Sequence, residues 1–191
     1  MPIWQYQNGR MDLNGHTAVM GILNITPDSF SDGGRYLDPD KAAARALELE
    51  AEGAEILDIG PQSTRPGHTP VSADEELDRL LPVLDRLKGR LSIPISVDTY
   101  FPQVARAALE RGAAIINDVS GSLENGMPAL AAHYGAGLVM MHAGGGADDR
   151  AEVDAVGVVR RYFQQALDTA ERAGLPLACV CLDPGIGFGK S

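Results

Sequence analysis

The sequence predicts an α/β fold and favours a TIM (β/α)8 barrel, with about six strands and five helices present. Two features carry this prediction. Short apolar runs alternate with helical patterns along the 191 residues, as repeated βα units with parallel strands require. A polar residue closes nearly every apolar run, and barrel active sites are built at strand carboxyl ends. An open doubly wound sheet, the alternative, would gather its ligand contacts at one switch point.

Six apolar runs have the continuous character of strands that are buried on both faces. The predicted strands are Ala18–Ile25, Glu55–Gly60, Ile93–Thr99, Ala114–Val119, Gly137–His142 and Leu177–Asp183. The polar residues that close them are Asn24, Asp58, Asp98, Asn117 with Asp118, His142 and Asp183.

Helical patterns lie between the strands, and their ends carry capping signals. Asp38-Pro39 opens "DKAAARALELEAEG", and Ser72-Ala-Asp-Glu75 is a capping box that opens the next helix. The remaining helical segments are "PQVARAALERG", "GMPALAAHYG" and "VDAVGVVRRYFQQALDTAERAG". Gly53, Gly112 and Gly174 stand where helices should stop. No shift in composition marks a boundary, so one domain is predicted.

The composition disfavours several classes of protein. A formal net charge of -10 makes a nucleic-acid partner unfavourable, because an acidic chain repels phosphate backbones. No apolar run approaches the roughly 18 residues of a membrane span, and "MPIWQYQNGR" contains no apolar signal segment. Cys179 and Cys181 are expected to be reduced core residues. We therefore expect a cytoplasmic protein with small-molecule ligands and no membrane partner.

The polar residues at the strand ends allow two interpretations. Such residues are often turn formers or helix caps, and Asp58 and Asp118 fit that role as well as a functional one. Counting with the two-residue period of a strand places Asp98, Asn117 and Asp183 on one face of their respective strands. If those faces point into the barrel, two carboxylates and a carboxamide converge at its mouth. They would then need a partner that carries N–H donors.

Two long loops follow consecutive strands, in "GILNITPDSFSDGG" and in "GPQSTRPGHTP". Long loops in compact domains are usually functional, and Arg65 in the second offers a planar fork for carboxylates or phosphates. By contrast, "LDPGIGFGKS" has one residue too few between its glycines for a phosphate-binding P-loop. The four histidines show no paired spacing for zinc. A magnesium ion held partly by a substrate pyrophosphate would need little from the protein.

Five segments resemble, in order, the signature segments of the bacterial dihydropteroate synthases. They are "GILNITPDSFSDGG", "DIGPQSTRPG", "SVDT", "INDVSG" and "LDPGIGFGK", and the resemblance extends over essentially the whole chain. That family is a TIM barrel of folate biosynthesis and a target of sulfonamides. Its members are transferases that condense 6-hydroxymethyl-7,8-dihydropterin pyrophosphate with p-aminobenzoate, which gives 7,8-dihydropteroate and pyrophosphate.

The resemblance implies a role for each matching position. Asp98, Asn117 and Asp183 would line the pterin pocket as catalytic residues, where carboxylates accept the N–H donors of the pterin edge. Asn24 would coordinate the Mg²⁺ that neutralises the departing pyrophosphate, and Met140 would pack on the pterin ring.

The two loops would supply most of the other substrate contacts. The remaining substrate-binding residues would be Phe30, Asp32, Thr64, Arg65, Pro66, Phe188 and Lys190. Thr64 would contact the pterin substrate, and Arg65 and Pro66 would form the p-aminobenzoate pocket with Phe188. The segment Thr26–Gly34 would close over the substrates and exclude water.

Two features differ from the family pattern. Pro61-Gln62 stands where the family usually has Gly-Glu. The family's later segments, Ser-Arg-Lys and Arg-x-His, and the C-terminal helices of its common homodimer are missing. We therefore expect one pterin-binding domain over 1–191 that is C-terminally incomplete, with its oligomeric state open. A non-catalytic pterin-binding fragment and a methyltetrahydrofolate-dependent methyltransferase are the alternatives.

Overall fold

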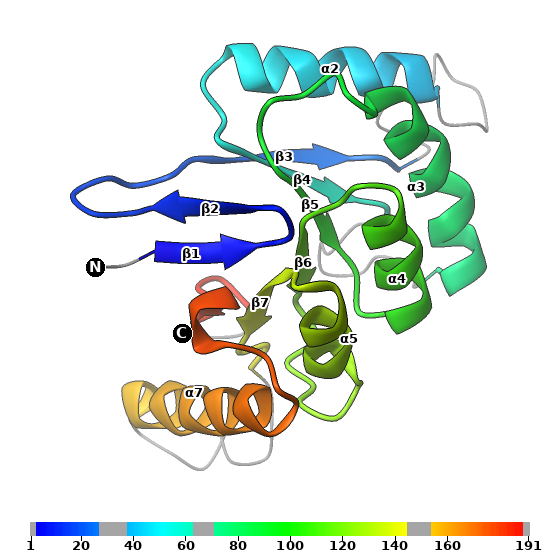
Figure 1. Cartoon of the computed structure of the whole chain (residues 1–191). Coiled ribbons are helices and arrows are strands. Elements are labelled where there is room, and N and C mark those ends of the chain that lie inside the picture. The colour runs from blue at the N-terminus through cyan, green and yellow to red at the C-terminus, as the bar shows by residue number, and fades with distance from the viewer. Residues whose placement is uncertain (1–2, 27–37, 63–70, 145–153, 189–191) are drawn as a thin grey trace.

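The computed structural model describes residues 3–26, 38–62, 71–144 and 154–188, and its main feature is a six-stranded parallel sheet. The strands are β3 (Met20–Asn24), β4 (Ile56–Gly60), β5 (Ile95–Asp98), β6 (Ile115–Asp118), β7 (Gly137–Met141) and β8 (Val180–Asp183). They lie side by side in chain order, without the reversal that defines a doubly wound sheet. Figure 1 shows the helices outside this sheet. The prediction of a partial (β/α) barrel is confirmed.

The helices begin and end at the residues that the sequence indicates. They are α2 (Pro39–Ala51), α3 (Ala73–Leu87), α4 (Pro102–Glu110), α5 (Met127–Tyr134) and α7 (Ala155–Arg172). Asp38 Oδ1 accepts hydrogen bonds from the N–H groups of Asp40 and Lys41 at 3.0 and 3.2 Å, and Ser72 Oγ accepts from that of Glu75 at 3.2 Å. After α2, Gly53 has a φ of 106°, which favours glycine at the end of a helix.

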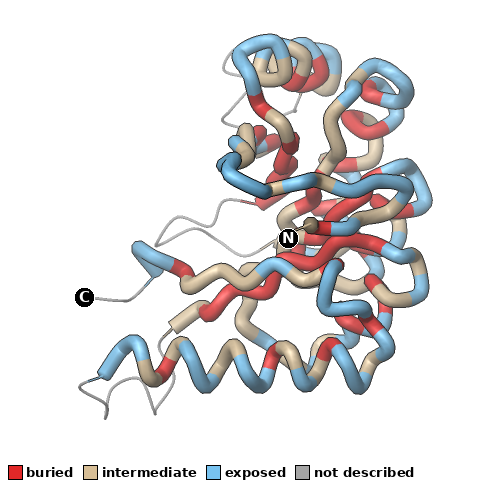
Figure 2. The backbone as a smooth tube through the Cα atoms, turned by 60° about the vertical axis from the view of Figure 1, so that its left-hand side comes forward, coloured by how far each residue is buried: buried red, intermediate tan, exposed pale blue. Residues whose placement is uncertain are grey.

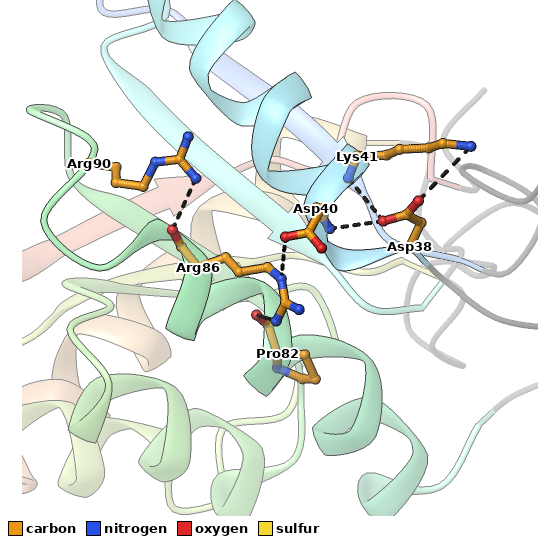
Figure 3. A network of polar contacts seen from close by, with 6 residues as sticks. All are labelled: Asp38, Asp40, Lys41, Pro82, Arg86 and Arg90. Carbon is orange, nitrogen blue, oxygen red and sulfur yellow. Dashed lines mark hydrogen bonds and ion pairs between the residues drawn. The ribbon is translucent and has the colours of Figure 1, made fainter.

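Helices α2 and α3 are also joined by polar contacts at the surface. Arg86 Nε lies 2.5 Å from Asp40 Oδ1, and Figure 3 shows this arginine reaching from α3 to the start of α2. The same guanidinium donates to the carbonyl oxygen of Pro82 at 3.3 Å. Exposed ion pairs contribute little to stability. The association of the two helices therefore rests on the apolar core beneath them.

The sheet has two different faces, and the larger apolar core lies between one of them and the helices. Leu57, Val97, Ile116 and Leu138 belong to this core, and each is at most 1% exposed. Figure 2 shows the buried residues concentrated in the strands and on the facing sides of helices. Strand register places the alternate residues, among them Asp58, Ser96, Asn117 and Met141, on the opposite, interior face.

An N-terminal hairpin, which was not predicted, covers the start of several strands. It consists of β1 (Ile3–Tyr6) and β2 (Gly9–Asp12), joined by a turn in which Asn8 has a φ of 63°. Trp4 Nε1 donates to the carbonyl oxygen of Cys179 at 3.0 Å, and Trp4 packs with Ile56, Ile115 and Val139 in a second core cluster. The hairpin therefore closes the interior at the amino-terminal ends of the strands.

The strand predicted over Leu177–Asp183 is shorter than expected. Its first residues form a 3₁₀ turn, η1 (Leu177–Cys179), and the strand begins at Val180. Both cysteines are free, but only Cys179 is buried, whereas Cys181 is exposed on the outer strand β8. The expectation that Cys181 is a core residue was wrong, because in the described part of the chain β8 pairs with β7 alone.

The interior is open between the two outer strands of the described sheet, β3 and β8. Ile22, on the interior face of β3, is 64% exposed. A cavity of about 450 Å³ extends here from Trp4 and Met11 in the hairpin to Cys181 and Asp183. Among the described helices, none has the length and apolar character needed to cross a membrane.

Candidate functional site

A buried carboxylate lies at the centre of the polar residues on the interior face. Asp58, on β4, is 4% exposed. Its Oδ1 accepts a hydrogen bond from Ser96 Oγ at 2.6 Å, and its Oδ2 accepts one from Asn117 Nδ2 at 3.1 Å. Burial raises the pKa of Asp58, and these two donors oppose the rise. The turn-former interpretation of Asp58 was therefore wrong, and its pairing with Ser96 in the strand register assigns it to the site.

Asp98 lies beside this group at the end of β5. Burial raises the pKa of Asp98 to about 8, and the negative charges of Asp58, Glu76 and Asp118 add to the rise. A pKa in this range favours the protonated carboxyl group at neutral pH when no ligand is present. A ligand that offers N–H donors would favour the ionised form, because each donated hydrogen bond stabilises the carboxylate.

Asn24 and Asp98 approach the same position from two sides, at Gly60. A methyl group placed on Gly60 would lie 3.2 Å from Asn24 Oδ1 and 3.8 Å from Asp98 Oδ2. A contact of 3.2 Å is tighter than ordinary van der Waals packing, so a larger residue would push Asn24 away. Glycine at this position keeps the polar groups at the carboxyl ends of β3, β4 and β5 close together.

Asp183 faces the same interior from β8. Its Oδ1 accepts a hydrogen bond from the N–H group of Gly185 at 2.7 Å, which fixes the turn after the strand. Asp183 lines the cavity between the outer strands together with Cys181. Phe188, farther along the chain, is 40% exposed.

Met140, the residue predicted to pack on the pterin ring, does not point to the interior face of the sheet. Met140 lies in the helix-facing core with Leu138, on the opposite side of the sheet from Asn117. Met141 is paired in register with Asp183 and shares its interior face. Met140 therefore faces the helices, away from Asn117 and Asp183, and Met141 takes the interior position.

Asp118 and His142, which also close strands, lie away from this group. Asp118 accepts hydrogen bonds from the N–H group of Ser120 at 3.0 Å and from Asn125 Nδ2 at 2.6 Å, so it is a turn former. His142 is 8% exposed and packs edge-on against Tyr162, with ring centroids 5.1 Å apart. Burial raises the pKa of Tyr162, and the charge of Asp118 adds to the rise.

A buried carboxylate on the helix side of the sheet was not predicted from the sequence. Glu76 on α3 is 1% exposed, and its Oε2 accepts a hydrogen bond from Thr99 Oγ1 at 2.7 Å. A usable signal was present, because Glu76 falls on the apolar stripe of α3 with Leu80 and Leu84. Burial raises the pKa of Glu76, against the effects of Thr99 and Arg79.

The remaining predicted site residues lie outside the described part of the chain. They are Phe30, Asp32, Thr64, Arg65, Pro66 and Lys190. Within the described residues, no group of three or more histidine, cysteine, aspartate or glutamate side chains could hold a metal ion.

Comparisons with known proteins agree on one family. A family model described as "Pterin binding enzyme" matches residues 20–191. The dihydropteroate synthase of Streptococcus pyogenes is 45% identical over 184 residues, which are 96% of this chain and 68% of that protein.

Solved structures give the same result. The Clostridium difficile dihydropteroate synthase, determined in the presence of pteroic acid, superposes with a TM-score of 0.87 and 41% identity over 95% of this chain and 68% of that chain. The Burkholderia cenocepacia dihydropteroate synthase complexed with 7,8-dihydropteroate superposes with a TM-score of 0.84 and 37% identity. The match covers 99% of this chain and 65% of that chain. The chain thus spans about two thirds of the length of these relatives. It belongs to the family of pterin-binding enzymes.

Proposed function

We propose that this chain is a dihydropteroate synthase, a transferase that joins 6-hydroxymethyl-7,8-dihydropterin pyrophosphate to p-aminobenzoate. The observation that supports this most directly is the interior group of Asp58, Ser96, Asn117 and Asp98 at the carboxyl ends of β4, β5 and β6. Relatives that share 37–45% of its residues carry the same name, and two were solved with pteroic acid or 7,8-dihydropteroate.

The pterin ring would bind through its aminopyrimidinone edge. This edge carries adjacent N–H donors, and carboxylates are the matching acceptors. Asp98 and Asp183 face the interior from opposite sides of β6 and β7, and Asn117 offers a carboxamide between them. We assign the contact with the flat face of the ring to Met141, which shares the face of Asp183.

The reaction begins with a break at the pterin methylene carbon. Its C–O bond to pyrophosphate breaks with the electron pair on oxygen, and the amine nitrogen of p-aminobenzoate then bonds to the carbon and loses a proton to solvent. Positive charge develops on the pterin before this attack. Carboxylates at Asp98 and Asp183 would stabilise the developing charge more than the neutral substrate, which lowers the barrier.

A magnesium ion would take only part of its coordination from the described residues. The exposed Asn24 side chain lies at the mouth, with its Oδ1 beside Gly60, and can provide one oxygen ligand. Mg²⁺ usually keeps several waters and binds substrate phosphates, so one protein oxygen fits it. When bound, it would neutralise charge on the departing pyrophosphate.

The two substrates are the partners that this proposal requires. It includes no nucleic acid and no membrane, in keeping with a net charge of -10. The two free cysteines are compatible with the reducing conditions of the cytoplasm, where we place the reaction.

Binding and turnover must be measured separately on the same preparation. We expect pteroic acid to bind the wild-type chain, and Asp98→Asn to weaken binding at least tenfold. Formation of 7,8-dihydropteroate from the two substrates, lost in Asp98→Asn, would establish the enzyme. Binding without turnover would instead support the alternative of a non-catalytic pterin-binding protein. If pteroic acid does not bind, the assignment of the interior group is wrong.

A further inference from the structure

The backbone ladder between β4 and β5 ends just before the site. Its last pair is Ile59 with Val97, so Gly60 and Asp98 lie beyond it. On the other side, Asp98 is still paired with Asn117, and the N–H group of Thr99 donates to the carbonyl oxygen of Asn117 at 3.2 Å. The position of Asp98 relative to β6 is thus set by backbone pairing. Its position relative to β4 must be set by something else.

Two side chains from one face of α3 reach the ends of these two strands. Glu76 Oε2 accepts a hydrogen bond from Thr99 Oγ1 at 2.7 Å, directly after Asp98. Arg79 Nη1 donates to the carbonyl oxygen of Pro61 at 2.8 Å, directly after Gly60. Residues three positions apart lie on one side of a helix. One turn of α3 therefore holds both strand ends.

A third contact joins the same two segments without the helix. The hydroxyl group of Tyr100 donates to Gln62 Oε1 at 3.2 Å. Thr99 Oγ1 also accepts a hydrogen bond from the N–H group of Phe101 at 3.2 Å, which fixes the turn that leads into α4. We call the three contacts Glu76–Thr99, Arg79–Pro61 and Tyr100–Gln62 the α3 bracket.

The chemistry of Glu76 points to more than packing. Glu76 and Thr99 are each 1% exposed, and burial of a carboxylate is costly even when it is hydrogen-bonded. A leucine at position 76 would extend the stripe of Leu80 and Leu84 without that cost. The glutamate instead provides an acceptor to the hydroxyl group that follows Asp98.

We propose that Glu76, acting through Thr99, is a positioning residue that fixes Asp98 opposite Gly60 for pterin binding. This inference rests on the proposed function. Arg79 and Tyr100 complete the bracket by holding the segment after Gly60. The bracket sets the width of the gap between β4 and β5 where their backbone pairing has ended.

The test compares two substitutions of Thr99 by titration of the whole chain with pteroic acid. Thr99→Val keeps the shape of the side chain and removes the hydroxyl group, so we expect pteroic acid to bind at least tenfold more weakly. Thr99→Ser keeps the hydroxyl group and should bind within about twofold to threefold of wild type. Rescue by serine distinguishes positioning by the hydroxyl group from a general effect of substitution at a buried site.

Glu76→Leu separates binding from stability. The apolar side chain suits its stripe on α3, so the thermal unfolding temperature should be equal to or above that of wild type while binding weakens as in Thr99→Val. Thr169→Val, at a half-buried position of α7, is the matched control and should bind like wild type. Glu76→Leu and its control still test the positioning role if Thr99→Val does not fold.

The outcomes distinguish this inference from the proposed function. If Asp98→Asn weakens binding but both Thr99→Val and Glu76→Leu bind like wild type, the positioning role is wrong and the pterin site stands. If Asp98→Asn also binds like wild type, or if the wild-type chain does not bind, the proposed function is wrong and the positioning role falls with it.

Discussion

Asn117 Nδ2 donates to Asp58 Oδ2 across 3.1 Å, although β5 lies between the strands that carry these residues. In a flat sheet, strands two places apart are separated by about 9.6 Å, twice the usual spacing. Contact between their short side chains therefore requires that the sheet curve around its interior face. Layers formed by alternate strands are also the way in which a (β/α)8 barrel fills its interior.

Asn117→Asp should disrupt this contact with little change in shape. The variant loses the N–H donor and places a second carboxyl group against Asp58, where two like charges cannot both remain ionised. We expect pteroic acid to bind at least tenfold more weakly, or about 1.4 kcal/mol. Asn125→Asp makes the same change beside Asp118, outside the site, and should leave affinity unchanged. An equal loss in both variants would contradict the assignment.

Asp98→Asn should make the protein more stable at neutral and alkaline pH. The pKa of Asp98 is about 8 in the folded chain, against about 3.9 when unfolded. Between these values the folded state binds more protons than the unfolded state, so the free energy of unfolding falls as pH rises. This penalty is absent below the unfolded pKa and complete above about pH 8.

The variant should therefore unfold like wild type near pH 4 and be more stable at pH 8 by an amount on the order of 5 kcal/mol, which is the free-energy equivalent of the difference between the two pKa values. Urea unfolding at both pH values measures the difference. Asp78→Asn, on an exposed position of α3, should show no such dependence on pH. A variant that gains no stability at pH 8 would show that Asp98 is ionised in the free protein.

The strands and helices could be predicted because their signals are local. Asp38 and Ser72 form the predicted N-caps, and Gly53 ends its helix in the left-handed region. The hairpin was not predicted because its stability depends on residues distant in sequence, such as the contact from Trp4 to Cys179. Asn8-Gly9, between Tyr6 and Met11, was the available signal.

The candidate site could be predicted where a strand is polar on one face only. Ser96 and Asp98 reveal the interior face of β5 by themselves. The strand β7 is buried on both faces, so its sequence carries no sign of which methionine points inward. Only the pairing of Met141 with Asp183 in the register resolves this. The buried role of Glu76 was not predicted because its hydrogen-bond partner, Thr99, lies outside α3.

The two methionines should respond differently to truncation. Met140→Ala removes side-chain volume from the helix-facing core, so the free energy of unfolding should fall by about 2–5 kcal/mol while the folded variant binds pteroic acid normally. Met141→Ala removes the interior contact and should weaken pteroic acid binding at least fivefold. Titration below the unfolding temperature of each variant, with chemical unfolding in parallel, tests the assignment. The reverse pattern would restore Met140 as the ring contact.

Gly60 and Gly21 offer a final contrast between the site and the core. A methyl group on Gly21 would lie 2.9 Å from Ala54 Cβ, closer than real contacts allow, so Gly21→Ala must shift the backbone against the segment that follows α2. We expect Gly21→Ala to lower the free energy of unfolding by about 1–3 kcal/mol and to leave the affinity of the folded protein unchanged.

Gly60→Ala should show the opposite behaviour. Its methyl group would press on Asn24 Oδ1 at 3.2 Å, a side chain that is exposed and can rotate away at little cost in stability. Moving Asn24 removes the proposed oxygen ligand of Mg²⁺, so dihydropterin pyrophosphate should bind more weakly in the presence of Mg²⁺. Pteroic acid, which lacks the pyrophosphate, should lose less affinity. Equal losses for the two ligands would mean that Gly60 serves the pterin end of the site through Asp98 instead.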